Sequence, residues 1–515
     1  MAVLLLIAAL LAICTLLIYK RRTQYWKTRG IPGPEPSLFV GNILDLLNYN
    51  FPGVLQLREW SKKYGKYYGI YEGWRRVLVL SDIDMLQELF VKKFEYFHGR
   101  KLFALAADPD KEPNVHVFDA RGARWKRLRN LSNTSFTVNN LKKVMPTVQH
   151  SVDVMVGFMA EKADTGESFN IHSFFQELTL DVIARIAMGQ KGSRQFQNEY
   201  LEDVKGVFTR QQPTFFIVTP LVFPFLQKFI RKLLITLSTL KLRKVSFRDL
   251  MNKVTVAVKE RKEARARGER EEVDEFGNAR VDFIDLFLNA ESDEIQEKRE
   301  FERSGLKVEK KLTTPEIVSQ CLVFLLAGFD TTANSLAYAS FCIAKNPAVQ
   351  RRLQAEIDEV CGDGAVTYEQ LQKLTFMEKV IKEALRLYPL GAFASSRVCM
   401  KTTTLGNVEV REGDLVQADV FSVHYDKNLW PDPERFDPDR WNSEEKRHLL
   451  AWFPFGAGPR TCVGLRLAYM EEKLALAQIL RRYNIVAGPE SEEKLVLVGN
   501  SVVQPKSVTV RLQSR

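Results

Sequence analysis

The chain has 515 residues, of which 45% are apolar and 27% charged, and 74 Lys and Arg against 63 Asp and Glu give a net charge of +11. A chain of this size and composition can bury a large core, which excludes a disordered, collagen-like or disulfide-dense small protein. The mean hydropathy of −0.18 excludes a protein with many membrane spans. Six cysteines without a C-x-x-C pair are typical of a reducing compartment.

The first predicted element is an apolar helix over residues 1–18, MAVLLLIAALLAICTLLI, which contain no charge, proline or glycine. Eighteen helical residues extend about 27 Å, close to the roughly 30 Å hydrocarbon thickness of a bilayer. Lys20, Arg21 and Arg22 follow directly, and basic residues after an apolar run stay in the cytosol. The alternative, a cleaved signal peptide, would carry its basic residues before the apolar run and a small-residue cleavage site after it. The sequence therefore predicts an uncleaved transmembrane anchor over 1–19.

The segment after the anchor is basic and rich in proline. Three prolines occur in 31–36, IPGPEP, so we expect residues 20–36 to form a stiff hinge before a body over 37–515. Within that body, segment 67–80 is rich in aromatic and β-branched residues around a glycine and predicts a β-hairpin. The pattern over about 120–350 is mostly helical, and the highly charged stretch 259–275 predicts a solvated helix end and loop.

Segment 207–240 is unusually rich in phenylalanine. Its phenylalanines alternate with prolines that prevent one long helix, namely Phe208, Phe215, Phe216, Phe223, Phe225 and Phe229 with Pro213, Pro220 and Pro224. One interpretation is ordinary core. The other interpretation, which the predicted anchor favours, is an apolar lid that touches the bilayer and admits apolar substrates.

The clearest helix is predicted after Thr313. A Thr cap, a proline in the first turn and Glu316 three positions later begin it, and Asn346-Pro347 ends it near Lys345. The helix is apolar on nearly all faces, so it should be buried. Its middle, AGFDTT over 327–332, places a carboxylate and two hydroxyls in that apolar helix. Such groups need partners or a purpose, and they form either a satisfied structural kink or a polar notch that handles a ligand or proton.

A constrained loop near the C-terminus surrounds one cysteine. The segment 453–464, FPFGAGPRTCVG, has three glycines and two prolines and precedes an amphipathic helix predicted from Leu465 to about Tyr483. A cysteine close to a helix N-terminus, with an arginine two residues earlier, is in a setting that favours the thiolate. Backbone N–H groups of such a turn can donate to the sulfur. We therefore distinguish Cys462 from the other cysteines of the body, which are expected to be ordinary buried residues.

The pattern F-x-x-G-x-R-x-C-x-G resembles the haem-binding signature of the cytochrome P450 family. Four further motifs follow in that family's order: W-x-x-x-R at 125–129, A-G-x-D-T-T at 327–332, E-x-x-R at 383–386, and P-x-R-F at 438–441 with Trp441 in place of Phe. The resemblance covers essentially the whole chain. It is strongest to the animal clan that contains the vertebrate family-three enzymes, which oxidise drugs and steroids.

The resemblance implies a fold and a set of site residues. The fold would be mainly α with a smaller β-rich lobe, preceded by the anchor helix. Cys462 would be the axial ligand of the iron of haem b, and thiolate ligation is how this family promotes O–O cleavage. The remaining roles implied are propionate binding by Trp125, Arg129, Arg397 and Arg460 with Arg100 as a weaker candidate, cofactor contacts from Phe455 and Gly464, a structural cluster of Glu383, Arg386 and Arg440, and catalytic proton delivery by Asp330 and Thr331.

The function implied is that of a membrane-anchored haem-thiolate monooxygenase. It would insert one atom of O₂ into an apolar small molecule such as a steroid, lipid or xenobiotic, from a single-pass position in the endoplasmic reticulum membrane with the catalytic domain on the cytosolic face. Electrons would come from NADPH through NADPH-cytochrome P450 reductase, with cytochrome b5 as an additional donor, because the chain has no G-x-G-x-x-G fingerprint of its own. The alternative is a peroxide isomerase or a non-catalytic haem-binding protein of the same fold. Nucleic-acid binding is excluded because no recognisable module accompanies the basic charge.

Overall fold

The computed structural model describes residues 1–208, 214–269, 273, 277, 282–292, 308–442 and 447–515. Its helices are α1 (Ala2–Thr23), α2 (Ile43–Leu46), α3 (Gly53–Tyr64), α4 (Ile83–Gln87), α5 (Gly122–Ser135), α6 (Val138–Thr165), α7 (Ile171–Met188), α8 (Leu201–Phe208), α9 (Thr214–Val222), α10 (Gln227–Thr239), α11 (Ser246–Ala266), α12 (Phe283–Leu288), α13 (Thr314–Lys345), α14 (Pro347–Cys361), α15 (Tyr368–Lys373), α16 (Thr375–Leu387), α17 (Val420–His424) and α18 (Leu465–Arg482). Its strands are β1 (Tyr67–Glu72), β2 (Arg75–Leu80), β3 (Phe169–Asn170), β4 (Ser396–Val398), β5 (Thr403–Leu405), β6 (Val408–Val410), β7 (Leu415–Ala418), β8 (Tyr483–Val486), β9 (Leu497–Val498), β10 (Gln504–Pro505) and β11 (Thr509–Ser514).

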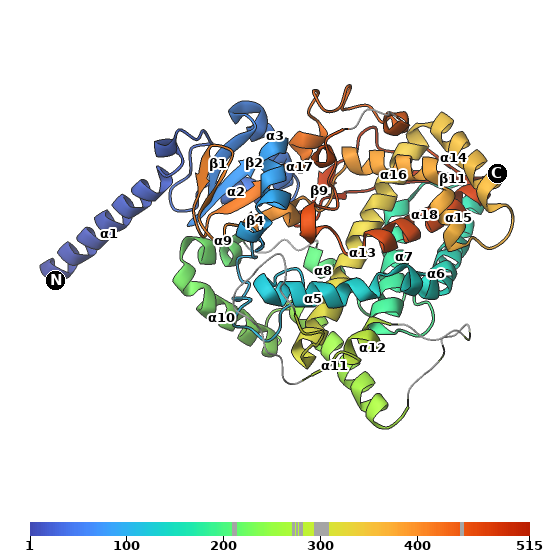
Figure 1. The fold of residues 1–515 in the computed structure, drawn as a ribbon, viewed down its shortest axis with the longest axis horizontal. Coiled ribbons are helices and arrows are strands. Elements are labelled where there is room, and N and C mark those ends of the chain that lie inside the picture. The colour runs from blue at the N-terminus through green and yellow to red at the C-terminus, as the bar shows by residue number, and fades with distance from the viewer. Residues whose placement is uncertain (209–213, 270–272, 274–276, 278–281, 293–307, 443–446) are drawn as a thin grey trace.

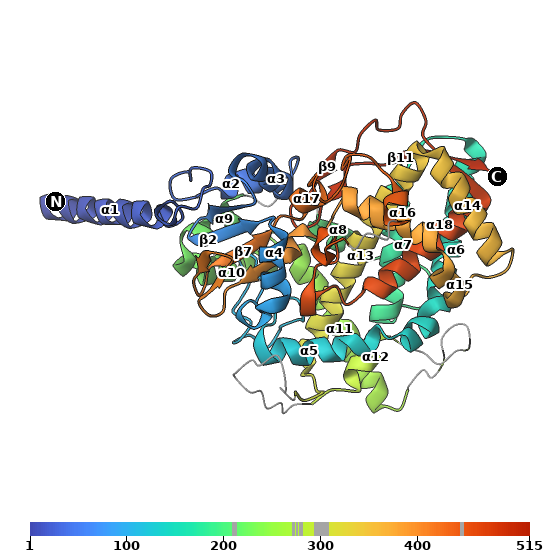
Figure 2. The same cartoon turned by 45° about the horizontal axis from the view of Figure 1, so that its top comes forward.

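A large helical body lies beside a smaller lobe built on a sheet, and the first helix extends away from that lobe (Figures 1 and 2). The main sheet has the strand order β1-β2-β7-β4, in which β2 and β7 are parallel and the other neighbours antiparallel. β1 and β2 form the hairpin that the sequence predicts over 67–80, with Gly73 and Trp74 at the turn. The prediction of a mainly α fold with a smaller β-rich lobe is confirmed.

The centre of the helical body is α13. Thr313 and Glu316 form the predicted capping box, in which the Thr313 hydroxyl accepts from the Glu316 N–H and the Glu316 carboxylate accepts from the Thr313 N–H. α13 packs against α7, α11, α16 and α18. A Cβ on Gly328 would lie 2.8 Å from Ile183, so this glycine permits the close approach of α7. Where the side chains are described, α13 has the length and apolar composition of a membrane span, and it is the buried core helix of the body.

α1 and the segment after it differ in their surroundings. Apolar side chains of α1 such as Leu5, Leu6 and Leu17 are exposed. From Tyr19 onward the chain packs on the β-rich lobe: the Tyr19 hydroxyl donates to the Ser37 carbonyl at 2.6 Å, and Trp26 is 2% exposed. Residues 20–36, predicted as a hinge, therefore belong to the packed surface of that lobe over much of their length.

The described part of 207–240 forms short helices rather than one long helix, and Pro224 begins the 3₁₀ turn η4 (Pro224–Leu226) between α9 and α10, whereas Pro220 lies inside α9. The side chains of Phe215, Phe223, Phe225 and Phe229 are exposed, whereas Phe208 and Phe216 are half-buried. Pro213 lies outside the described residues. The charged stretch 259–275 begins as the exposed end of α11, and residues 270–272 and 274–276 lie outside the described residues.

Candidate functional site

The Cys462 loop is held tightly against the β-rich lobe. The Cys462 N–H donates to the Phe455 carbonyl at 2.9 Å and closes the loop. Gly458 has φ +67°, and a Cβ there would lie 2.0 Å from the carbonyl oxygen of Phe90, so only glycine fits this contact. The loop then leads into α18, which begins at Leu465 as the sequence predicts. These contacts fix the position of the cysteine.

The Cys462 side chain is exposed at the surface of the loop. Many protein atoms nevertheless surround the thiol, and this desolvation raises its pKa. Hydrogen bonding from the Gly464 and Leu465 backbone and the charges of Arg129 and Arg100 act in the opposite direction and favour the thiolate. A Cβ on Gly464 would lie 3.5 Å from the Phe136 ring, at ordinary van der Waals distance. A metal cation at the sulfur would shift this balance to the thiolate.

Three arginines meet beside this loop. Arg397 on β4 and Arg460 are 1% and 2% exposed, and Arg100 is half-buried. Each is positioned by the main chain, since Arg397 donates to the Ser396 carbonyl at 2.7 Å, Arg100 to the Arg460 carbonyl at 3.1 Å and Arg460 to the Phe118 carbonyl at 3.2 Å. Arg460 also lies over the Trp125 ring, at 4.7 Å from its centroid.

Protein carboxylates balance little of the charge of this arginine cluster, because Asp119 acts on Arg100 and Arg460 only from beyond ion-pair distance. The Nε atoms of Arg100, Arg397 and Arg460 are buried without a hydrogen-bond partner, and in the described part of the chain none of the three forms an ion pair. Burial, and then the charge of Arg129, lowers the pKa of Arg100 to about 10. Planar guanidinium groups in such a setting suit a ligand that brings carboxylates, which fits the two propionates of haem.

A second cluster lies behind the loop around Glu383 on α16. Glu383 and Arg386 are fully buried, and the Arg386 Nε and Nη2 donate to the two Glu383 oxygens at 2.9 Å each. The Arg440 Nε donates to Glu383 Oε1 at 2.8 Å. Arg386 also donates to the carbonyls of His424 and Pro433. The predicted Glu–Arg–Arg cluster is thus formed, and it ties the loops of 424–440 to α16.

An aromatic chain connects this cluster to the cysteine loop. The Trp441 Nε1 donates to Glu383 Oε2 at 3.2 Å, and the Trp441 ring contacts Trp452 edge-on at 5.6 Å. The Trp452 ring lies 6.1 Å from Phe455 in the same manner. Trp441, the departure from the family pattern, therefore adds a hydrogen bond that phenylalanine could not make.

The two polar residues of the α13 notch face different surroundings. Asp330 is 1% exposed and accepts from Asn334 Nδ2 at 3.1 Å and from Gln176 Nε2 of α7 at 3.5 Å. Thr331 donates to the Ala327 carbonyl at 2.7 Å. Ala327 is exposed and its neighbours Leu326 and Gly328 are half-buried, so α13 borders open space beside Thr331. The structure places the two residues in one turn without a hydrogen bond between their side chains.

Burial raises the pKa of Asp330 to about 6, while the amides of Asn334 and Gln176 act in the opposite direction. These two amides were not singled out in the sequence. Asn334 is four residues after Asp330, and that spacing is the only signal for it. No local signal relates Gln176 to Asp330, because the two lie on different helices.

Aromatic residues from two separated segments meet near the arginines. The Phe393 ring lies 5.1 Å from Phe103 and 5.4 Å from Phe118. Phe118 also lies under the Arg100 guanidinium, at 4.2 Å from its centroid. Segments 101–118 and 390–396 thereby form one apolar wall beside the charged cluster.

Comparisons with known proteins agree with this geometry. A family model described as cytochrome P450 matches residues 31–511. A Caenorhabditis elegans chain named as cytochrome P450 cyp-13B1 is 44% identical over 501 residues, which are 95% of each chain. Caenorhabditis elegans CYP13A3 is 40% identical over 523 residues, covering 100% of this chain and 99% of the relative. The matched region includes all five sequence motifs and every residue of the clusters described above.

Proposed function

The chain belongs to the cytochrome P450 family, and on that premise we propose that it is a membrane-anchored haem-thiolate monooxygenase acting on apolar small molecules. As a member of the family it is an oxidoreductase that binds haem through a cysteine thiolate and uses O₂ and electrons from a redox partner. When bound, the haem supplies the redox chemistry that activates dioxygen for insertion of one oxygen atom into substrate.

The single observation that supports the site assignment is that Cys462 lies beside buried arginines that form no ion pair within the described residues. Cys462 supplies the thiolate, and the Phe455 and Gly464 ends of its loop hold the sulfur in place. Arg397 and Arg460, with Arg100, Arg129 and Trp125, bind the two propionates, which would satisfy the orphaned guanidinium atoms. The cluster of Glu383, Arg386 and Arg440 has a structural role, because it braces the chain that leads into the cysteine loop.

Thr331 and Asp330 deliver protons to dioxygen in the site. The Thr331 hydroxyl orients water in the space beside Ala327, and the Asp330 carboxyl can hold a proton near neutral pH because burial raises its pKa to about 6. Asn334 and Gln176 position that carboxyl. The two side chains act through water, since they make no direct hydrogen bond with each other.

The substrate is an apolar molecule such as a steroid, lipid or xenobiotic. Phe103, Phe118 and Phe393 provide an aromatic wall near the arginine cluster, and aromatic faces bind such molecules mainly by burial of apolar surface. The exposed phenylalanines of 215–229 would admit these substrates from a lipid phase.

The location is the endoplasmic reticulum membrane, crossed once by residues 1–19, with 37–515 as the haem-binding catalytic domain on the cytosolic face and 20–36 as the connection. Exposed apolar side chains along α1 and the basic residues Lys20 to Arg22 support this arrangement. The electron donor is NADPH-cytochrome P450 reductase, with cytochrome b5 as an additional donor. Exposed Arg466, in the first turn of α18 after Cys462, suits an acidic partner.

The test is the ferrous carbon monoxide spectrum of the haem-loaded protein. Cys462→Ala should abolish the thiolate-type Soret band, whereas Cys14→Ala, which removes an exposed cysteine of α1, should leave it unchanged. An unchanged band in Cys462→Ala would mean that another residue is the ligand. Product formation from O₂ and NADPH with added reductase then separates a monooxygenase from the alternative, a peroxide isomerase or non-catalytic haem protein.

A further inference from the structure

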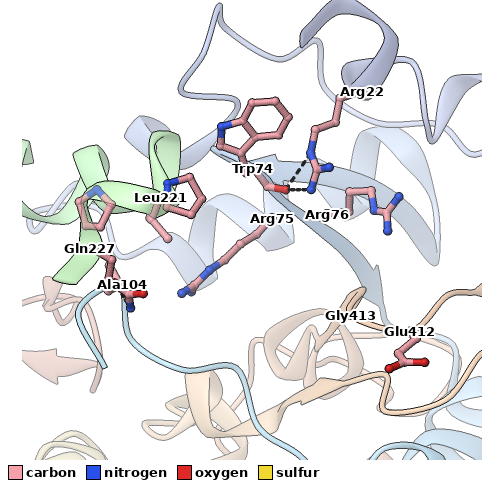
Figure 3. Close-up of a pocket in the computed structure, with 11 residues that line it drawn as sticks. Arg22, Trp74, Arg75, Arg76, Ala104, Leu221, Gln227, Glu412 and Gly413 are labelled. Carbon is pink, nitrogen blue, oxygen red and sulfur yellow. Dashed lines mark hydrogen bonds between the residues drawn. The ribbon is translucent and has the colours of Figure 1, made fainter. Parts of the chain in front are cut away.

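A cavity of about 300 Å³ lies where α1 joins the β-rich lobe (Figure 3). Its walls come from the end of α1, the turn between β1 and β2, and the segment from α9 to α10. These walls are pinned together, because the Trp74 N–H donates to the Leu221 carbonyl at 2.8 Å and the Gln227 side chain donates to the Ala104 carbonyl at 3.1 Å. A Cβ on Gly73 would lie 2.3 Å from the Leu221 oxygen, so the close contact also needs glycine.

Three arginines line this cavity, and two of them lack a carboxylate partner. Arg76 forms an ion pair with buried Asp414 at 2.6 Å. Arg22 donates to the Trp74 carbonyl, and Arg75 donates to the Leu102 carbonyl at 2.7 Å. Within the described residues, neither Arg22 nor Arg75 is in an ion pair. Figure 3 shows Arg75 extending toward Ala104 and Gln227, with Arg22 beside the Trp74 backbone.

Asp414 and Glu72 act on Arg22 and Arg75 at longer range, but each of these carboxylates already forms an ion pair with another cation. Glu72, beside Arg75 across the hairpin, pairs with Lys101 at 2.8 Å. Glu412 is the one carboxylate among the residues that line the cavity, and it is exposed. The charges on Arg22 and Arg75 therefore leave this half-buried space with an excess of positive charge.

Exposed apolar side chains adjoin the same cavity. Pro224, which lines it, lies between Phe223 and Phe225, and these two phenylalanines are 40% and 78% exposed. Both views show α9 and α10 on the side of the molecule from which α1 extends (Figures 1 and 2). A ligand with an anionic head and an apolar tail would match both features.

We propose that this cavity binds the phosphate-bearing headgroup of an anionic phospholipid, with its acyl chains over Phe223 and Phe225. Arg22 and Arg75 contact the phosphate, for which planar guanidinium groups are well suited. The volume is at the small end of ligand pockets, which suits a headgroup and excludes a whole lipid. The inference rests on the proposed membrane attachment, because the membrane is the source of the lipid.

The binding test uses full-length, haem-loaded protein in detergent and a monomeric short-chain lipid, so that the charge of a bilayer surface does not contribute. Titration calorimetry with dihexanoyl phosphatidic acid should show saturable binding, with much weaker binding of dihexanoyl phosphatidylcholine and of inorganic phosphate. Arg75→Gln and Arg22→Gln should each weaken phosphatidic acid binding about tenfold. The matched control is Lys232→Gln, which removes an exposed charge of α10 outside the cavity and should change affinity less than about twofold.

Two outcomes would overturn the inference. Equal binding of inorganic phosphate and phosphatidic acid would assign the site to a free anion, and unchanged affinity in both arginine variants would place any lipid elsewhere. An intact carbon monoxide spectrum shows that the variants are folded. Flotation with phosphatidylcholine vesicles measures membrane attachment separately, so loss of the lipid site with normal flotation leaves the proposed function standing.

Discussion

The indole Nε1 of Trp441 donates a hydrogen bond to Oε2 of Glu383, 3.2 Å away. It is one of several donors on this carboxylate, with Arg386, Arg440 and the Asp437 N–H. A fully buried carboxylate needs such donors because its desolvation is costly. The tryptophan thus contributes to the cluster both its ring and a hydrogen bond.

Trp441→Phe should keep the aromatic packing and lose this charge-assisted hydrogen bond. We expect the free energy of unfolding to fall by about 2 kcal/mol, measured by urea unfolding of the haem-loaded protein. Trp452→Phe is the control, because its indole donates to a neutral acceptor, the Lys382 carbonyl, and its loss should cost about 1 kcal/mol. Equal losses in the two variants would show that the Glu383 charge adds nothing to the bond.

Thr331→Ala should uncouple electron use from product formation. The hydroxyl is proposed to orient the water that carries protons beside Ala327, so we expect NADPH consumption to continue while product per NADPH falls about tenfold or more. Thr331→Ser keeps a hydroxyl and should retain most of the coupling. Full coupling in Thr331→Ala, measured by product and hydrogen peroxide assays, would remove this residue from the relay.

Asp330 should impose a pH dependence on stability. Burial raises its pKa from 3.8 to about 6, so between these values the folded protein holds a proton that the unfolded chain has released. Stability therefore falls as the pH rises through this window. Asp330→Asn cannot ionise, so its free energy of unfolding relative to the parent should rise by about 3 kcal/mol across the window.

The measurement for Asp330 is urea unfolding at several pH values. Asp363→Asn, which replaces an exposed carboxyl, controls for the removal of an aspartate. Parallel pH profiles for the parent and Asp330→Asn would contradict the raised pKa.

Arg397→Gln should weaken haem retention. Its guanidinium is 1% exposed, with Nε unpartnered, and we propose that a propionate satisfies it. Loss of a charge-assisted contact of this kind should speed haem transfer to apomyoglobin about tenfold or more. Arg411→Gln, an exposed arginine paired with Glu409, should leave the transfer rate unchanged. Unchanged transfer in Arg397→Gln would exclude the propionate contact.

Deletion of residues 2–18 should release the protein from membranes at high salt while its carbon monoxide spectrum stays normal. Retention of the shortened chain in the membrane fraction would contradict the anchor. A cut after residue 29 is expected to destabilise the body as well, because it removes Trp26, whose indole packs on Gly69 and donates to the Ile70 carbonyl. Loss of a large core side chain of this kind costs about 3–5 kcal/mol.

Features with local causes could be predicted from the sequence. The start of α13 follows from Thr313, Pro315 and Glu316, and its end from Asn346-Pro347, because caps and breakers act within one turn. The hairpin at 67–80 has the same local character. The parallel pairing of β2 with β7 joins residues more than 300 positions apart, and no periodic pattern encodes that choice.

The candidate site also has one part that the sequence predicts and another that it does not. The loop around Cys462 stands out in the sequence, and the resemblance of its motifs to a known family implies the arginines, whereas the Gln176 contact with Asp330 depends on how α7 packs against α13. The packing of Trp26 was also missed, since a basic, proline-rich stretch is typical of a hinge. Both contacts arise only when distant surfaces meet.

Three hydrogen bonds hold the end of α1 and the residues that follow it. Tyr19, Arg22 and Trp26 donate to the carbonyls of Ser37, Trp74 and Ile70. Three such contacts attach α1 rigidly to the β-rich lobe. In a bilayer, the tilt of α1 would be passed to the whole body, and the exposed phenylalanines of α9 and α10 would lie at one fixed height above the lipid. The depth in the bilayer from which apolar substrates enter would then depend on these three contacts rather than on the site where the substrates react.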